Sequence, residues 1–139
     1  MKEIVRHPNV YIEYDRALSL VNDEIAKEGP QYTYTRDQSG ACWNVEYDES
    51  TGEWVGSCLV GRVLIAAGVD PERLGYESVR DADVQQVRSE LAELKMTEKA
   101  MDFLAHVQGS QDIGRTWGEA VTGAVELAFY DNQDDSLYL

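Results

Sequence analysis

With 139 residues, the chain has the length of one domain, placed at 1–139 with a short acidic C-terminal tail from about 131 to 139. Its 26 aspartates and glutamates outnumber its 12 lysines and arginines, and the formal net charge is −14. This charge gives no attraction to nucleic-acid phosphates or anionic membranes, so both are excluded as direct partners and basic proteins are favoured. The hydrophobic fraction of 43% is that of an ordinary globular protein.

The sequence also favours a cytoplasmic location. No apolar run approaches the roughly 18 residues of a transmembrane helix, and residues 1–8 have no apolar core of signal-peptide length. The two cysteines, Cys42 and Cys58, are too few for a disulfide scaffold, so we expect free thiols in a reducing compartment. A disulfide between them stays open as an alternative.

A helix is predicted first, capped by Asn9 and running to about Glu28, where Gly29 and Pro30 stop it. Its apolar stripe at helical spacing consists of Tyr14, Leu18, Val21 and Ile25.

The apolar period then changes to two, which is typical of strands. Alternation predicts a β-hairpin with strands at Gln31–Thr35 and Cys42–Tyr47 around a turn at 37–40. A second polar turn at 48–53 leads to a short third strand at Trp54-Val55.

The next predicted helix, Cys58–Ala67, is apolar nearly all round and therefore buried. Ser57 is its expected cap, and Gly61 predicts a close approach to a neighbouring element, since glycine otherwise weakens a helix. Gly68 ends this helix, and a short helical turn begins at Asp70-Pro71.

Two further helices are predicted between residues 84 and 109. The first has Lys95 at its C-terminal end, and its apolar residues are Val84, Val87, Leu91 and Leu94. Thr97 caps the second, with Met96 and Met101 forming a hydrophobic staple, and Gly109 weakens its end.

The last helix opens with a capping box made by Thr116 and Glu119. Trp117 is expected on its buried face, and Gln111 or Asp112 is expected to bond the backbone of the preceding turn. The acidic tail is expected to fray. The predicted fold class is α+β, with about five helices packed around a small antiparallel β-hairpin or three-stranded sheet.

Catalytic and cofactor chemistry has little support in these residues. Cys58 at a helix N-terminus could be activated, but an inert buried cysteine is the commoner outcome. Two cysteines and two histidines, His7 and His106, lack the spacing of a zinc site, and no glycine-rich phosphate motif occurs. We therefore expect no metal, no cofactor and no enzymatic activity.

The best candidate site is an aromatic patch with an acidic rim, suited to binding a protein. Core packing is the competing explanation for each ring taken alone. The candidate residues are Tyr32, Tyr34, Trp43, Tyr47, Asp48, Glu49, Glu53 and Trp54.

Three stretches carry a resemblance to a known group of proteins. They are Tyr32–Tyr34 with Cys42; Cys58–Leu64 followed by Gly68-Val69; and Gln108, Gln111-Asp112, Gly114 and Thr116–Ala120. In these the chain resembles small, acidic, mostly uncharacterised proteins of actinobacterial bacteriophages. The resemblance implies a protein made in the cytoplasm of an infected host, and small phage proteins of this type commonly bind host proteins.

Three functions follow as hypotheses. The first is a non-enzymatic phage accessory protein that binds a host protein through its acidic and aromatic surface. The second is an acidic DNA mimic that occupies a host DNA-binding protein. The third is a small enzyme that uses Cys58. Self-association through the hairpin aromatics stays open beside all three.

Overall fold

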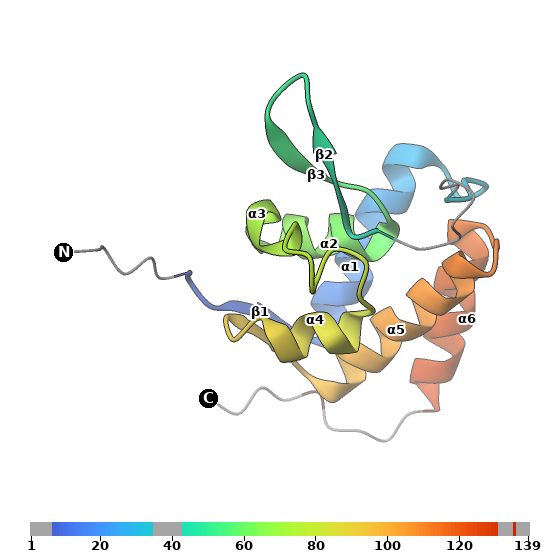
Figure 1. Ribbon diagram of the computed structural model, residues 1–139. Coiled ribbons are helices and arrows are strands. Elements are labelled where there is room, and N and C mark those ends of the chain that lie inside the picture. The colour runs from blue at the N-terminus through green and yellow to red at the C-terminus, as the bar shows by residue number, and fades with distance from the viewer. Residues whose placement is uncertain (1–6, 35–42, 131–134, 136–139) are drawn as a thin grey trace.

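The computed structural model describes residues 7–34, 43–130 and 135, which form one α+β unit of helices with two small sheets (Figure 1). This confirms the predicted fold class. In chain order the elements are β1 (Val10–Ile12), α1 (Tyr14–Glu28), β2 (Val45–Asp48), β3 (Glu53–Gly56), α2 (Leu59–Ala67), α3 (Pro71–Leu74), α4 (Val84–Glu90), β4 (Leu94–Met96), α5 (Glu98–Asp112) and α6 (Trp117–Phe129).

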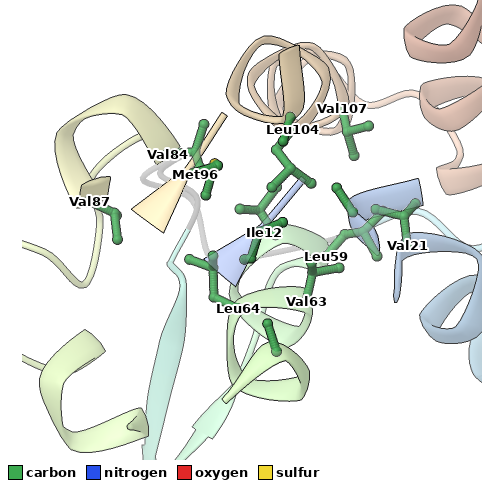
Figure 2. Close-up of a cluster of buried hydrophobic side chains, with 14 of the residues drawn as sticks. Ile12, Val21, Leu59, Val63, Leu64, Val84, Val87, Met96, Leu104 and Val107 are labelled. Carbon is green, nitrogen blue, oxygen red and sulfur yellow. The ribbon is translucent and has the colours of Figure 1, made fainter. Parts of the chain in front are cut away.

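A parallel strand pair lies inside the helical body. Strand β1 pairs with β4 so that Val10 opposes Leu94 and Ile12 opposes Met96. Figure 2 shows Ile12 between α5, which contributes Leu104, and α2. Ile12 is fully buried, so this pair is part of the hydrophobic core.

The predicted start of the first helix is wrong, because residues 10–12 pair with β4 and α1 begins at Tyr14. Its N-cap residue, Glu13, makes no side-chain capping bond. Asp135 supplies one instead: its carboxylate accepts from the Tyr14 backbone N–H and from the Thr97 hydroxyl, both at 2.8 Å. The expected fraying is therefore wrong at Asp135, and the rest of the tail lies outside the described residues.

The predicted hairpin at 31–47 is also wrong in its first strand. Residues 32–34 form no strand, and the expected turn and Cys42 lie outside the described residues. The carbonyls of Pro30 and Tyr32 instead accept from the first N–H groups of α6, those of Gly118 (2.9 Å) and Trp117 (2.8 Å). The antiparallel hairpin forms further on, between β2 and β3, with Tyr47 opposite Trp54.

Helix α2 packs closely against the start of β2, as Gly61 predicted. A methyl group at Gly61 would collide with the backbone carbonyl of Asn44. The cap of α2 is Cys58 rather than Ser57, since the Cys58 sulfur accepts from the Gly61 N–H at 3.4 Å. Gly68 ends the helix in the left-handed conformation, φ 116°, as expected.

Asn44 is a buried polar junction that explains the close approach. Its side-chain amide donates to the carbonyls of Val79 and Ala82, each at 3.0 Å. Its own carbonyl accepts from Ser57 N–H at 3.0 Å, and its N–H donates to Arg80 at 2.6 Å. The junction ties the segment after α3 to the hairpin and to α2.

Helix α4 is shorter than predicted and ends at Glu90. Leu94 and Lys95 belong to β4, where Leu94 is buried and Lys95 is exposed. The apolar spacing continued past the helix because β4 also directs Leu94 and Met96 into the core. The Thr97 cap of α5 is confirmed, and Gly109 lies within α5 rather than at its end.

The C-terminal part of α5 holds α2 and α6 together. The Gln111 side-chain carbonyl accepts from the Leu59 backbone N–H at 2.9 Å and from the Trp117 indole N–H at 3.1 Å. Gln111 therefore bonds two other helices. The capping box of α6 is confirmed, and Trp117 is fully buried, as expected.

Candidate functional site

The β2–β3 hairpin projects from the helical body (Figure 1). The Asp48 carboxylate shapes its turn by accepting from the Ser50 hydroxyl at 2.6 Å and from the Ser50 N–H at 3.0 Å. Both bonds lower the pKa of Asp48, and the bond from the Ser50 hydroxyl has the larger effect. Gly52 completes the turn with a φ of 72°, which a glycine adopts without strain.

An aromatic pair lies on one face of this hairpin. The Tyr47 and Trp54 rings are opposite each other, with centroids 5.3 Å apart and planes inclined by 66°. Tyr47 is 52% exposed, whereas Trp54 is half-buried. Gly75 lies under Trp54, and a methyl group there would come within 2.5 Å of the indole ring. The end of α3 therefore supports the pair from below.

A groove of about 560 Å³ lies between the hairpin and α3. Within the described residues, Glu53 and Glu72 have no salt-bridge partner, while Asp70 caps α3 and lies 3.9 Å from the His7 ring nitrogen. The groove thus joins an aromatic pair to carboxylates from two elements. We call it the hairpin groove, and its lining residues are Tyr47, Gly52, Glu53, Trp54, Asp70, Pro71 and Glu72.

Three of the eight predicted site residues lie elsewhere. Tyr32 packs edge-on against buried Trp117, with ring centroids 4.5 Å apart. The Tyr34 hydroxyl is 2.6 Å from the Ser57 hydroxyl, and the Arg80 guanidinium covers the Trp43 ring at 5.1 Å. Asp48 and Glu49 belong to the hairpin turn beside the groove.

Sequence reasoning missed the side of the groove that α3 contributes. Asp70 and Pro71 carried a local signal, the start of a short helix, and this signal is confirmed. Nothing in the local pattern linked them to a hairpin about 20 residues earlier, because that contact is tertiary. Gly75, which admits the Trp54 ring, carries no sequence signal for that contact, since a glycine after a short helix ordinarily marks its end.

A partly buried ion pair fixes α3 to the segment before β4. The Arg73 guanidinium donates two hydrogen bonds to Glu93, at 2.7 and 2.8 Å, and covers the Tyr76 ring at 5.4 Å. Glu93 is only 7% exposed. Arg73 lowers the pKa of Glu93 by these bonds, which outweigh the opposing effect of burial.

This ion pair predicts how stability depends on pH. Because the folded pKa of Glu93 lies below its unfolded value, the pair stabilises the fold above the unfolded pKa, and this contribution is lost as pH falls through the folded pKa. The free energies of unfolding of the wild type and of Glu93→Gln, measured in urea, should therefore differ most near pH 7 and become equal in acid. A difference that is constant from pH 7 to pH 3 would contradict the assignment.

Cys58 caps α2 and is shielded from solvent. It is fully buried, and its thiol donates to the Asn44 side-chain oxygen at 3.6 Å. Alkylating reagents reach exposed thiols, so in a Cys42→Ser background we expect iodoacetamide to modify Cys58 only as fast as the protein opens. Mass spectrometry with and without urea measures this. Rapid modification of the native protein would contradict this expectation and favour the enzyme hypothesis.

The two histidines lie in different parts of the fold. His7 lies beside Asp70, and His106 lines a groove of about 500 Å³ between α5 and α6. Among residues 7–34, 43–130 and 135, no three His, Cys, Asp or Glu side chains are grouped so that they could hold a metal ion. None of the helices in these ranges has both the length and the apolar character needed to span a bilayer.

Comparison with known proteins adds no further constraint on the site. No protein-family model matches the chain, and neither the curated proteins nor the solved structures include a match to it.

Proposed function

We propose that this chain is a non-enzymatic binding protein whose hairpin groove receives a basic surface of another protein. The observation that supports this most is the Tyr47–Trp54 pair, whose tyrosine is exposed, set beside Glu53 and Glu72, two carboxylates that have no counter-ion among the described residues. Aromatic residues dominate the energetics of protein interfaces, and negative charge steers a basic partner towards them.

The resemblance to actinobacterial phage proteins gives the proposal its biological setting. A phage accessory protein made in the host cytoplasm would meet host proteins there, and its net charge of −14 favours basic ones. We therefore propose a host protein as the partner.

The test is capture of a partner from an actinobacterial lysate with three tagged proteins. We expect the wild type to retain a partner, and Tyr47→Ala to weaken its binding by about 2 kcal/mol, or roughly thirty-fold, as truncation of an interface anchor does. Phe129→Ala is the matched control, since it removes an aromatic ring that is 81% exposed at the end of α6. Circular dichroism verifies that both variants stay folded.

Three outcomes would contradict the proposal or part of it. Equal capture by the wild type and Tyr47→Ala would remove the hairpin groove from the interface. Displacement of the partner by added DNA would favour the DNA-mimic hypothesis, because the partner's nucleic-acid site would then be the one occupied. Retention that does not weaken as salt rises would remove the electrostatic part of the proposal.

A further inference from the structure

We infer that the hairpin groove is a pocket for the side chain of one arginine of the partner protein. The inference rests on the proposed function and makes it more specific, since it names the group that occupies the groove. Its basis is the combination of a tryptophan that no cation covers with carboxylates that lack a counter-ion, both within residues 7–34, 43–130 and 135.

The uncovered ring is that of Trp54. The other two tryptophans of the chain each lie under a guanidinium: Arg62 covers Trp117 and Arg80 covers Trp43, both at 5.1 Å from the ring centroid. In the part of the chain that the structure describes, no cation covers Trp54, although it is half-buried and lines the groove. An arginine from outside would complete at Trp54 the packing that this protein uses at its other tryptophans.

The geometry of the aromatic pair suits a flat cation. Tyr47 and Trp54 are inclined by 66°, so they form two sides of a corner rather than a closed stack. A guanidinium in that corner can cover one ring while the other ring contacts its edge or its aliphatic stem. Cation–π attraction is strongest at tryptophan, and arginine uses it more often than lysine does.

The carboxylates supply the second half of the pocket. Glu53 begins β3 and Glu72 lies in α3, so the two approach the groove from different elements. Neither has a salt-bridge partner within the described residues. A guanidinium has five donors in a planar fork and can bond two carboxylates while its face stays on a ring, whereas an ammonium is a compact and strongly hydrated charge.

The same combination already occurs inside this protein. Arg73 donates two bonds to Glu93 while its guanidinium covers the Tyr76 ring at 5.4 Å. The hairpin groove offers the carboxylate and the ring of such an arrangement without the arginine. Its volume of about 560 Å³ leaves room for a side chain that enters from a partner surface.

The experiment uses capped seven-residue peptides of glycine and serine whose central residue is arginine, lysine or citrulline. Binding is followed through the Trp54 indole N–H signal in NMR spectra, which is assigned by its loss in Trp54→Phe. We expect the arginine peptide to shift this signal saturably. The lysine peptide should bind several-fold more weakly, and citrulline, which keeps the shape without the charge, should give no saturable shift.

Two carboxylate variants test the charge. Glu53→Gln combined with Glu72→Gln should weaken binding of the arginine peptide by about tenfold, since it removes both counter-ions. Glu126→Gln, an exposed carboxylate of α6, is the matched control and should leave the affinity unchanged. Choline, added as a small cation, should bind more weakly than the arginine peptide because it has no N–H donors.

Each of the remaining outcomes overturns the inference. These are equal shifts with arginine and citrulline, the absence of saturation, an affinity that the double variant does not change, and binding of choline as tight as that of the arginine peptide.

The two proposals fail separately. If Tyr47→Ala abolishes capture but the arginine peptide does not bind, the binding role stands without the arginine pocket. If the peptide binds but Tyr47→Ala captures the partner normally, the pocket stands and the proposed interface falls.

Discussion

Replacement of Trp117 with alanine is expected to lower the free energy of unfolding by about 3–5 kcal/mol, as truncation of a large core side chain does. The indole is fully buried, and its N–H donates to Gln111. Tyr32 packs against its edge and the Arg62 guanidinium covers its face. The substitution would leave a cavity where α2, α5 and α6 meet and would take one donor from the buried Gln111 carbonyl.

Urea unfolding followed by far-UV circular dichroism measures this effect without relying on tryptophan fluorescence. Trp117→Phe is the informative control, because it retains a ring for Tyr32 and Arg62 but lacks the indole N–H. Its cost should be clearly smaller than that of the alanine variant. If Trp117→Ala is fully stable and loses only partner capture, Trp117 belongs to the interface and not to the core.

Gly61→Ala should cost about 3 kcal/mol, at the upper end of the range for overpacking. The added methyl group would overlap the backbone of Asn44, which cannot move freely because its hydrogen bonds hold it to Val79, Ala82 and Ser57. Relief of the overlap would require α2 and the hairpin to separate.

Gly109→Ala is the matched comparison within the same chain. Gly109 also lies in a helix, but a methyl group there meets no atom within 4 Å. This variant should therefore stabilise the protein by about 0.5–1 kcal/mol, the helix preference of alanine over glycine. Thermal and urea unfolding measure the change in the free energy of unfolding for each variant, which should be opposite in sign for the two. Destabilisation of similar size in both would show that helix propensity, rather than the contact with Asn44, governs Gly61.

Local signals in the sequence predicted local structure well. The caps at Thr97 and Asp70 and the capping box at Thr116 are confirmed, because each depends on a side chain that bonds a backbone group two or three residues away. Gly61 is the more instructive case. A glycine inside an apolar helix implied a close neighbour, but the sequence did not say that the neighbour was Asn44.

The sequence patterns did not predict the pairing between distant segments. Strands β1 and β4 are three residues each and lie about 80 residues apart in the chain. Because they are so short, their apolar residues could not be distinguished from the apolar stripes of the neighbouring helices. The alternation of Tyr32 and Tyr34 resembled a strand, but the carbonyls of that segment serve the N-terminus of α6. For the same reason, only one side of the hairpin groove was predicted. Its aromatic side lies within the hairpin, whereas its other side comes from α3 and depends on a tertiary contact.

The distant capping of three helices has a consequence for how this protein is made. Helices α1, α2 and α4 receive acceptors for their first N–H groups from Asp135, Gln111 and Gln108, all of which are synthesised later. Cys58 and Asp83 cap later N–H groups of α2 and α4 locally, but the first N–H of each of the three helices has no acceptor until the later residue has been synthesised. We expect stable folding to require the segment that contains Gln108, Gln111 and Asp135, so the earlier helices should not complete their folding before that segment has been synthesised.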